Sequence, residues 1–128
     1  MAFLLDTVAL VLWWSEDDRL GKRARSVLMD AIEPVHLSAT NVWEIANKNR
    51  IGKLDAFGNF ARDFDDLVRR DGFRILDVTP AHAMRAGYLL GAHRDPFDRL
   101  LAGQALVEEM TVLTNDPQIA AFGCKVLW

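Results

Sequence analysis

Short apolar runs alternate along the chain with longer segments in which apolar residues recur at helical spacing. Continuous apolar runs of this length are typical of strands buried on both faces of a parallel sheet. Five runs fit this pattern, and the last is expected at a sheet edge: residues 2–5, 35–37, 73–78, 111–114 and 125–127. The pattern therefore predicts a series of short, mostly buried strands.

The segments between these runs have the spacing of helices. Helices are expected over residues 8–14, 15–31, 42–51, 56–70 and 80–90, then from Pro96 onward and briefly after Pro117. Alternation of strands and helices implies right-handed crossovers and a sheet covered on both faces. The sequence thus predicts a three-layer α/β/α fold with a central, mostly parallel sheet of four to five strands.

Length and composition fit this picture without adding to it. The 128 residues, of which 51% are hydrophobic and 26% charged, suit a single domain over residues 1–128. The formal charge of −3 means that any contact with nucleic acid must be local, or helped by bound cations or a partner subunit. A protein that holds nucleic acid by its overall field is thereby excluded.

Two further features bear on the cellular location of the protein. Cys124 is the single cysteine, so an intrachain disulfide is excluded and a reducing cytoplasm is expected. The apolar start has no basic lead-in, carries Asp6 and is too short to cross a bilayer. We therefore expect a buried strand and helix there, and no membrane association.

Acidic residues stand where the predicted strands end or helices begin. Asp6 closes the first strand, Asp116 follows the strand at 111–114, Asp95 and Asp98 open a helix, and Glu44 is expected in the first turn of another. Ligands of open parallel sheets bind beyond the carboxyl ends of the strands. These acids can therefore converge although they are distant in sequence.

Helix capping is the simpler interpretation of each acid taken singly. Asp95 precedes Pro96 as an N-cap would, Asp116 stands before a proline in the same way, and Asn41 with Glu44 resembles a capping box. Each such cap contributes about 1 kcal/mol. Capping explains each position but does not require the acids to meet.

Convergence of the acids favours a metal site. Carboxylates gathered at one edge repel one another and acquire raised pKa values unless a cation neutralises them. Ligation by oxygen alone, without the cysteine or histidine pairs of a zinc site, suits Mg²⁺ or Mn²⁺. Hydrolysis of a phosphodiester is the reaction that most often needs such a cluster.

Four motifs in order resemble the PIN-domain nucleases, and more closely their VapC-type toxin branch. They are Phe3-Leu-Leu-Asp-Thr7, Ser38-Ala-Thr-Asn-Val-Trp-Glu-Ile-Ala46, Arg94-Asp-Pro-Phe-Asp-Arg-Leu-Leu-Ala-Gly-Gln-Ala105 and Leu113-Thr-Asn-Asp116. The resemblance covers essentially the whole chain. One departure is Gly103, where relatives often carry a larger residue, and it bears on helix packing more than on chemistry.

The resemblance implies an acidic site that binds one or two Mg²⁺ or Mn²⁺ ions and activates water for attack on RNA. Its members would be Asp6, Glu44, Asp98 and Asp116. Asp98 is preferred to Asp95 because the family pattern places the acid directly before the Leu-Leu-Ala segment.

Supporting positions follow from the same resemblance. Thr7, Thr114 and Asn115 match small polar residues that orient ligands or metal-bound water in the family. Arg99 follows the acid as in many relatives, where it meets a phosphate or holds the carboxylates, and a structural ion pair is an equal alternative. His93 is expected to have only a solvated or hydrogen-bonded role in its loop.

Partners are implied in the same way. VapC-type toxins are the ribonuclease half of bacterial and archaeal toxin–antitoxin pairs, so the resemblance implies an RNA substrate, a cognate antitoxin, a homodimer and inhibition of translation and growth. Lys48, Arg50 and Lys53 could follow an RNA backbone, although a solvated helix end is the commoner explanation of such a run.

Two other classes of function stay open on the sequence. One is a phosphoryl-transfer enzyme or receiver-like domain in which Asp6 is the nucleophile or phosphoacceptor, although Thr7 and Val8 stand where such patterns need further acids. The other is a catalytically silent RNA-binding or interaction domain in which the acids are only helix caps.

Overall fold

A five-stranded parallel sheet forms the centre of the protein, whose computed structural model describes residues 1–54 and 57–128. The strand order is β3-β2-β1-β4-β5, and every neighbouring pair is parallel. The strands are β1 (Phe3–Leu5), β2 (Val35–Ser38), β3 (Arg74–Leu76), β4 (Thr111–Leu113) and β5 (Val126–Leu127). The predicted α/β class is confirmed, with β5 at an edge as expected.

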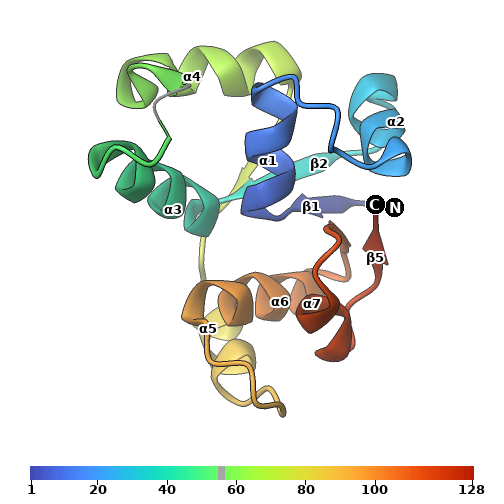
Figure 1. Ribbon diagram of the computed structural model, residues 1–128. Coiled ribbons are helices and arrows are strands. Elements are labelled where there is room, and N and C mark those ends of the chain that lie inside the picture. The colour runs from blue at the N-terminus through green and yellow to red at the C-terminus, as the bar shows by residue number, and fades with distance from the viewer. Residues whose placement is uncertain (55–56) are drawn as a thin grey trace.

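Helices cover both faces of this sheet (Figure 1). They are α1 (Thr7–Trp14), α2 (Lys22–Asp30), α3 (Ala39–Arg50), α4 (Phe60–Asp71), α5 (Pro80–Gly87), α6 (Pro96–Glu108) and α7 (Pro117–Ala121). In Figure 1, α1 to α4 lie above the sheet and α5 to α7 lie below it. The three layers of the predicted architecture are therefore present.

The alternation of side chains along β1 divides the core into two clusters. Phe3 and Leu5 belong to the cluster that contains residues of α1 to α4, whereas Leu4 belongs to the cluster under α6 and α7. Successive residues of a strand point to opposite faces, so a wholly apolar β1 is needed to fill both clusters. Its central place follows from that composition.

The helix expected over residues 15–31 is shorter than predicted. Glu16 has φ 54°, Gly21 is extended at the helix N-cap, and α2 begins at Lys22. The intervening segment is a turn in which Asp17 binds both the backbone N–H and the guanidinium of Arg19. Local hydrogen bonds of an aspartate side chain compete with helix formation in this way.

The capping box of α3 also differs from the expected one. The Ser38 hydroxyl accepts from Thr40 N at 3.0 Å, and Asn41 Oδ1 accepts from Ser38 N at 2.8 Å. Ser38 and Asn41 thus form the box, α3 begins at Ala39, and Glu44 lies in its second turn rather than its first. Glu44 is therefore free of a capping role.

Other boundaries shift by a few residues. The helix predicted from residue 56 begins at Phe60, and residue 56 itself lies outside the described part of the chain. The helix expected over 80–90 ends at Gly87, and the strand expected over 73–78 spans Arg74–Leu76. Over the described residues, no helix has the length and apolar character needed to cross a membrane.

The close packing of α5 against α6 depends on Gly103. A Cβ atom at this position would lie 2.9 Å from Ala86 N, from Ala86 Cβ and from the His82 carbonyl oxygen. Real Cβ atoms do not approach backbone atoms so closely, so the two helices can meet here only through a glycine. This contact gives a physical reason for the residue that departs from the family pattern.

Candidate active site

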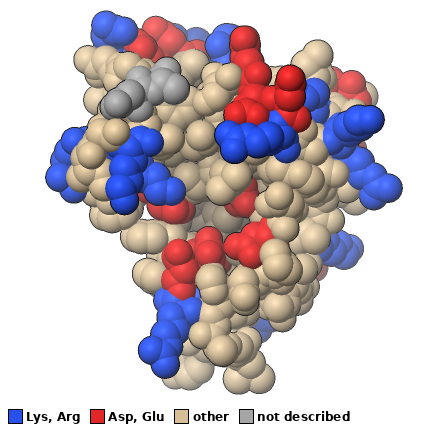
Figure 2. Space-filling view, viewed as in Figure 1, with Lys and Arg blue, Asp and Glu red and all other residues tan. Residues whose placement is uncertain are grey.

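Four acidic side chains come together at the carboxyl edge of the sheet. Asp6 follows β1 and caps α1, Asp116 follows β4 and caps α7, Asp98 lies in the first turn of α6, and Glu44 lies on α3. Leu5 of β1 pairs with Leu113 of β4, so the segments that follow both strands leave the sheet side by side. Acidic atoms surround a hollow in the middle of one face (Figure 2).

Asp6 is the most deeply buried of the four acids. Its side chain accepts from Ala9 N at 2.6 Å, and the residue is 8% exposed. Burial, aided by the charges of Asp98 and Asp116 and opposed by the hydrogen bonds of Thr114 and Ala9, raises its pKa from 3.8 to about 6. Asp6 therefore lies within the electrostatic reach of two other acids.

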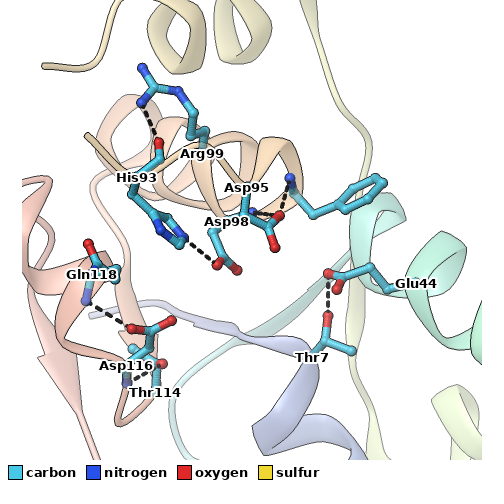
Figure 3. Close-up of polar contacts among 10 residues, drawn as sticks. Thr7, Glu44, His93, Asp95, Asp98, Arg99, Thr114, Asp116 and Gln118 are labelled. Atoms are coloured by element: carbon cyan, nitrogen blue, oxygen red, sulfur yellow. Dashed lines mark hydrogen bonds and ion pairs between the residues drawn. The ribbon is translucent and has the colours of Figure 1, made fainter. Parts of the chain in front are cut away.

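Glu44 and Asp98 face the same space (Figure 3). Partial burial raises the pKa of both carboxyls; the charges of Asp98 and Asp95 add to the effect on Glu44, and the charges of Asp95 and Asp116 add to that on Asp98. These effects join the four acids, together with Asp95, into one electrostatic cluster.

A hydrogen-bonded chain fixes Glu44. The Thr7 hydroxyl donates to Glu44 Oε1 at 2.7 Å, and Asn41 Nδ2 donates to Thr7 Oγ1 at 3.0 Å. Asn41 is fully buried, and its other amide atom holds the N-cap of α3. Sequence reasoning missed this use of Asn41, although its position three residues after Ser38 was a readable signal for a cap.

The pair Asp95 and Asp98 divides as expected. Asp95 Oδ1 accepts from Phe97 N at 2.9 Å and from Asp98 N at 3.2 Å, which makes Asp95 the N-cap of α6. Asp98 Oδ2 instead lies 2.7 Å from His93 Nε2, and its carboxylate points toward the centre of the site in Figure 3. The expected hydrogen-bonded role of His93 is thus directed at an acid of the cluster.

Asp116 has the capping role that its place before Pro117 predicts. Its side chain accepts from Gln118 N at 2.9 Å and so caps α7, while its backbone N–H donates to Thr114 Oγ1 at 3.0 Å. Thr114, which is 1% exposed, also hydrogen-bonds Asp6. The Thr114 side chain thus connects two of the acids.

Arg99 has a different environment from the one that a phosphate-binding role requires. Its guanidinium donates to the backbone carbonyls of Leu89 and His93 and lies 5.3 Å from the centre of the Phe122 ring. No acidic residue in the described part of the chain forms an ion pair with it. These contacts fix the loop before α6, the loop that carries His93.

The basic residues considered for RNA binding lie on α3 and just beyond it. Lys48 and Arg50 are exposed, Arg50 donates to Asn47 Oδ1 at 2.7 Å, and Lys53 follows the helix. Figure 2 shows basic side chains gathered beside the acidic hollow. Of the three, Lys48 is the residue whose charge reaches the cluster, because it lowers the pKa of Glu44.

An aromatic pair bridges the two helices that carry Glu44 and Asp98. The rings of Trp43 and Phe97 are stacked, with centroids 4.7 Å apart and an interplanar angle of 21°. Each residue immediately precedes an acid of the cluster. The stack therefore helps to set the spacing between α3 and α6, a role that the sequence pattern did not reveal.

The donor set suits a hard divalent cation. All four candidate ligands offer carboxylate oxygens, and their mutual repulsion falls when a cation is bound. Within residues 1–54 and 57–128, however, no three histidine, cysteine or acidic side chains lie close enough to hold one ion as they stand. Glu44 and Asp98 are held by Thr7 and His93, so ligation requires these side chains to rotate toward a common centre.

Residues 3–123 match the family model described as PIN domain. The chain belongs to the PIN-domain family. PIN domains are generally nucleases, so membership supports a hydrolase that acts on nucleic acid.

Solved structures similar to this PIN domain include a toxin–antitoxin complex from Klebsiella pneumoniae. VapBC2 from Rickettsia felis, bound to a promoter DNA fragment, has a TM-score of 0.74 at 17% identity and covers 100% of this chain and 99% of its own. FitAcB from Neisseria gonorrhoeae has a TM-score of 0.73 at 20% identity, with 98% and 96% covered. The complex from Klebsiella pneumoniae has a TM-score of 0.62 at 17% identity, with 98% and 95% covered.

At these identities the structural matches establish the fold of the PIN domain over its whole length. The curated protein sequences contain no significant match to the chain.

The raised pKa of Asp6 predicts a pH dependence of stability in the absence of metal. A carboxyl whose pKa rises from 3.8 to about 6 on folding binds its proton more tightly in the folded state. It therefore favours folding below about pH 4, and this contribution is lost as the pH rises through about 6. The loss amounts to about 2–3 kcal/mol.

Asp6→Asn retains the cap of α1 but cannot ionise, and it tests this prediction. In EDTA, the free energy of unfolding of the variant should rise relative to wild type between pH 4 and pH 7, as measured by urea unfolding at each pH. Parallel pH profiles of the two proteins would show that Asp6 ionises without penalty.

Proposed function

We propose that this PIN domain is an endoribonuclease that hydrolyses RNA phosphodiester bonds with the help of Mg²⁺ or Mn²⁺. The observation that carries the proposal is the cluster of Asp6, Glu44, Asp98 and Asp116, in which the charges of Asp98 and Asp116 raise the pKa of Asp6 and the charge of Asp98 raises the pKa of Glu44. Such a cluster is electrostatically costly unless it serves to bind a cation.

The four acids would hold one or two ions. A bound divalent ion supplies activation of water and neutralisation of the charge that develops on the phosphate. The chain's own residues contribute orientation: Asn41 holds Thr7, Thr7 holds Glu44, and Thr114 holds Asp6. Asn115, beside Thr114, would contact substrate or water.

We further propose that the protein is the toxin of a toxin–antitoxin pair and inhibits translation and growth by cleaving RNA. One of the similar structures named above is a toxin–antitoxin complex of the same fold, which supports this role. An antitoxin that places a basic side chain among the acids would neutralise them as a cation does. A homodimer is part of the same proposal.

The geometry gives less support to the two alternatives, a phosphoryl-transfer or receiver-like domain and a catalytically silent domain. As a nucleophile or phosphoacceptor, Asp6 would have to react through Oδ2, because Oδ1 accepts from Ala9 N, and in a site where it is only 8% exposed. A silent domain with acids as caps does not account for Glu44 or Asp98, neither of which accepts a capping hydrogen bond in the structure.

The proposed activity is tested by incubating the purified protein with single-stranded RNA and with DNA of the same sequence. We expect cleavage of RNA with Mg²⁺ or Mn²⁺ and none in EDTA. Glu44→Gln should lower the rate by about 100-fold or more, in the range typical for loss of one catalytic group. Cleavage that persists in EDTA would exclude the metal-dependent mechanism, and cleavage of DNA alone would exclude the ribonuclease.

A further inference from the structure

An apolar cleft of about 330 Å³ adjoins the acidic cluster. Val8, Val11 and Leu12 of α1 and Leu54 form its apolar surface, and Trp128 forms one wall. Thr7 and Asn115 also line it, so the cleft is continuous with the edge of the sheet where the acids lie. Thr7, which holds Glu44, therefore belongs both to the wall of the cleft and to the proposed catalytic site.

We propose that this cleft binds one nucleotide of the RNA substrate, with its base against the apolar surface and its phosphate near Lys48. The proposal rests on the proposed ribonuclease function and assigns to it a subsite next to the bond that is cleaved. Nucleobases are recognised by stacking on apolar and aromatic side chains when RNA is single-stranded. The volume lies at the lower end of the range of about 300–1,000 Å³ for small-ligand sites, which suits one nucleotide.

The part of α1 that lines the cleft is exposed to solvent, although α1 also packs in the core. Val8 is 53% exposed, although Ala9 and Leu10 beside it are fully buried. Trp128 packs closely against Gly21, where an added Cβ atom would lie 2.5 Å from the Trp128 Cδ1 atom. The cleft thus combines a packed aromatic wall with an exposed aliphatic surface, a pairing that suits a flat, apolar base.

The charges at the cleft favour a nucleotide over a segment of another protein. Lys48 and Arg19 line it, and among the described residues Lys48 has no acidic partner in an ion pair. Arg19 pairs with Asp17 at 2.8 Å but keeps 80% of its side chain exposed. Every nucleotide of RNA carries a phosphate that can pair with these cations. An apolar protein segment can pair with them only if it also carries acidic residues.

The subsite is tested by methyl NMR of the protein in EDTA, titrated with AMP, CMP, GMP and UMP, and separately with ribose 5-phosphate. We expect at least one nucleotide to shift the methyl signals of Val8, Val11 and Leu54, and ribose 5-phosphate to leave them unchanged. Val8→Gln should weaken that nucleotide about three- to tenfold. Met84→Gln is the matched control, because Met84 is a 64% exposed apolar residue on α5, and it should bind as wild type does.

Three results would overturn the proposal: no shift with any nucleotide, equal shifts with ribose 5-phosphate, or shifts produced only by a short acidic, leucine-containing peptide. The last would assign the cleft to a protein segment. Because binding is measured without metal, the outcome is independent of cleavage. If the protein cleaves RNA but shows none of these shifts, only the proposed subsite is contradicted. If it shows the shifts but does not cleave RNA, only the proposed ribonuclease activity is contradicted.

Discussion

Asp98→Ala is expected to lower metal-dependent RNA cleavage by about 1,000-fold or more while leaving the protein folded. Asp98 points into the acidic cluster and its pKa is raised, chiefly by burial, so its ionised form does not stabilise the metal-free fold. Removal of a group that acts on the developing charge typically costs about two to three orders of magnitude, and loss of a metal ligand adds to this. Initial rates with Mn²⁺, together with thermal unfolding, measure both effects.

Asp95→Ala is the matched control three residues away. It removes the N-cap of α6, which accepts from Phe97 N and Asp98 N, and should cost about 1 kcal/mol of stability. Cleavage below the unfolding transition should stay within a few-fold of wild type. Equal losses of activity in the two variants, compared at matched stability, would mean that the roles of the two aspartates are wrongly divided.

Gly103→Ala is expected to destabilise the protein by about 2 kcal/mol, although alanine is the better helix former. The added methyl group would meet Ala86 N and the His82 carbonyl at 2.9 Å, and backbone atoms of a packed helix cannot move aside as the end of a flexible side chain does. Helices α5 and α6 must separate to admit it. We expect the Tm to fall by roughly 6–10 °C, as measured by differential scanning calorimetry.

Gly87→Ala provides the comparison on the facing helix. Gly87 is the last residue of α5, and a Cβ atom there would meet nothing within 4 Å. Because alanine loses less backbone entropy on folding, this substitution should leave stability unchanged or raise it by up to about 1 kcal/mol. A similar loss of Tm in both variants would contradict the close-contact explanation for Gly103.

The sequence was sufficient for the fold and for the convergence of the acids. Apolar runs ending at Asp6 and before Asp116 placed these acids at strand ends, and parallel pairing of β1 with β4 then brings them together. The proline after Asp95 marked the start of α6 in the same direct way. These features depend on residues close in sequence, which a pattern can reveal.

Other features depend on contacts between distant segments. The capping box was placed at Asn41 and Glu44, because Asn41 is a good cap in isolation, but Ser38 begins the helix and frees Glu44 for Thr7. The stack of Trp43 on Phe97 and the cleft beside α1 are formed only when separate elements pack together. The pattern of apolar and polar residues along the chain does not predict such contacts between distant segments.

The four acids come from both helical layers and from the sheet between them. Glu44 comes from the layer of α1 to α4, Asp98 and Asp116 come from the layer of α5 to α7, and Asp6 ends the strand between them. An ion held by all three parts would act as a non-covalent cross-link through the thickness of the domain. Hydrogen exchange in both helical layers should then slow together when Mn²⁺ is added, because opening either layer would first require release of the ion.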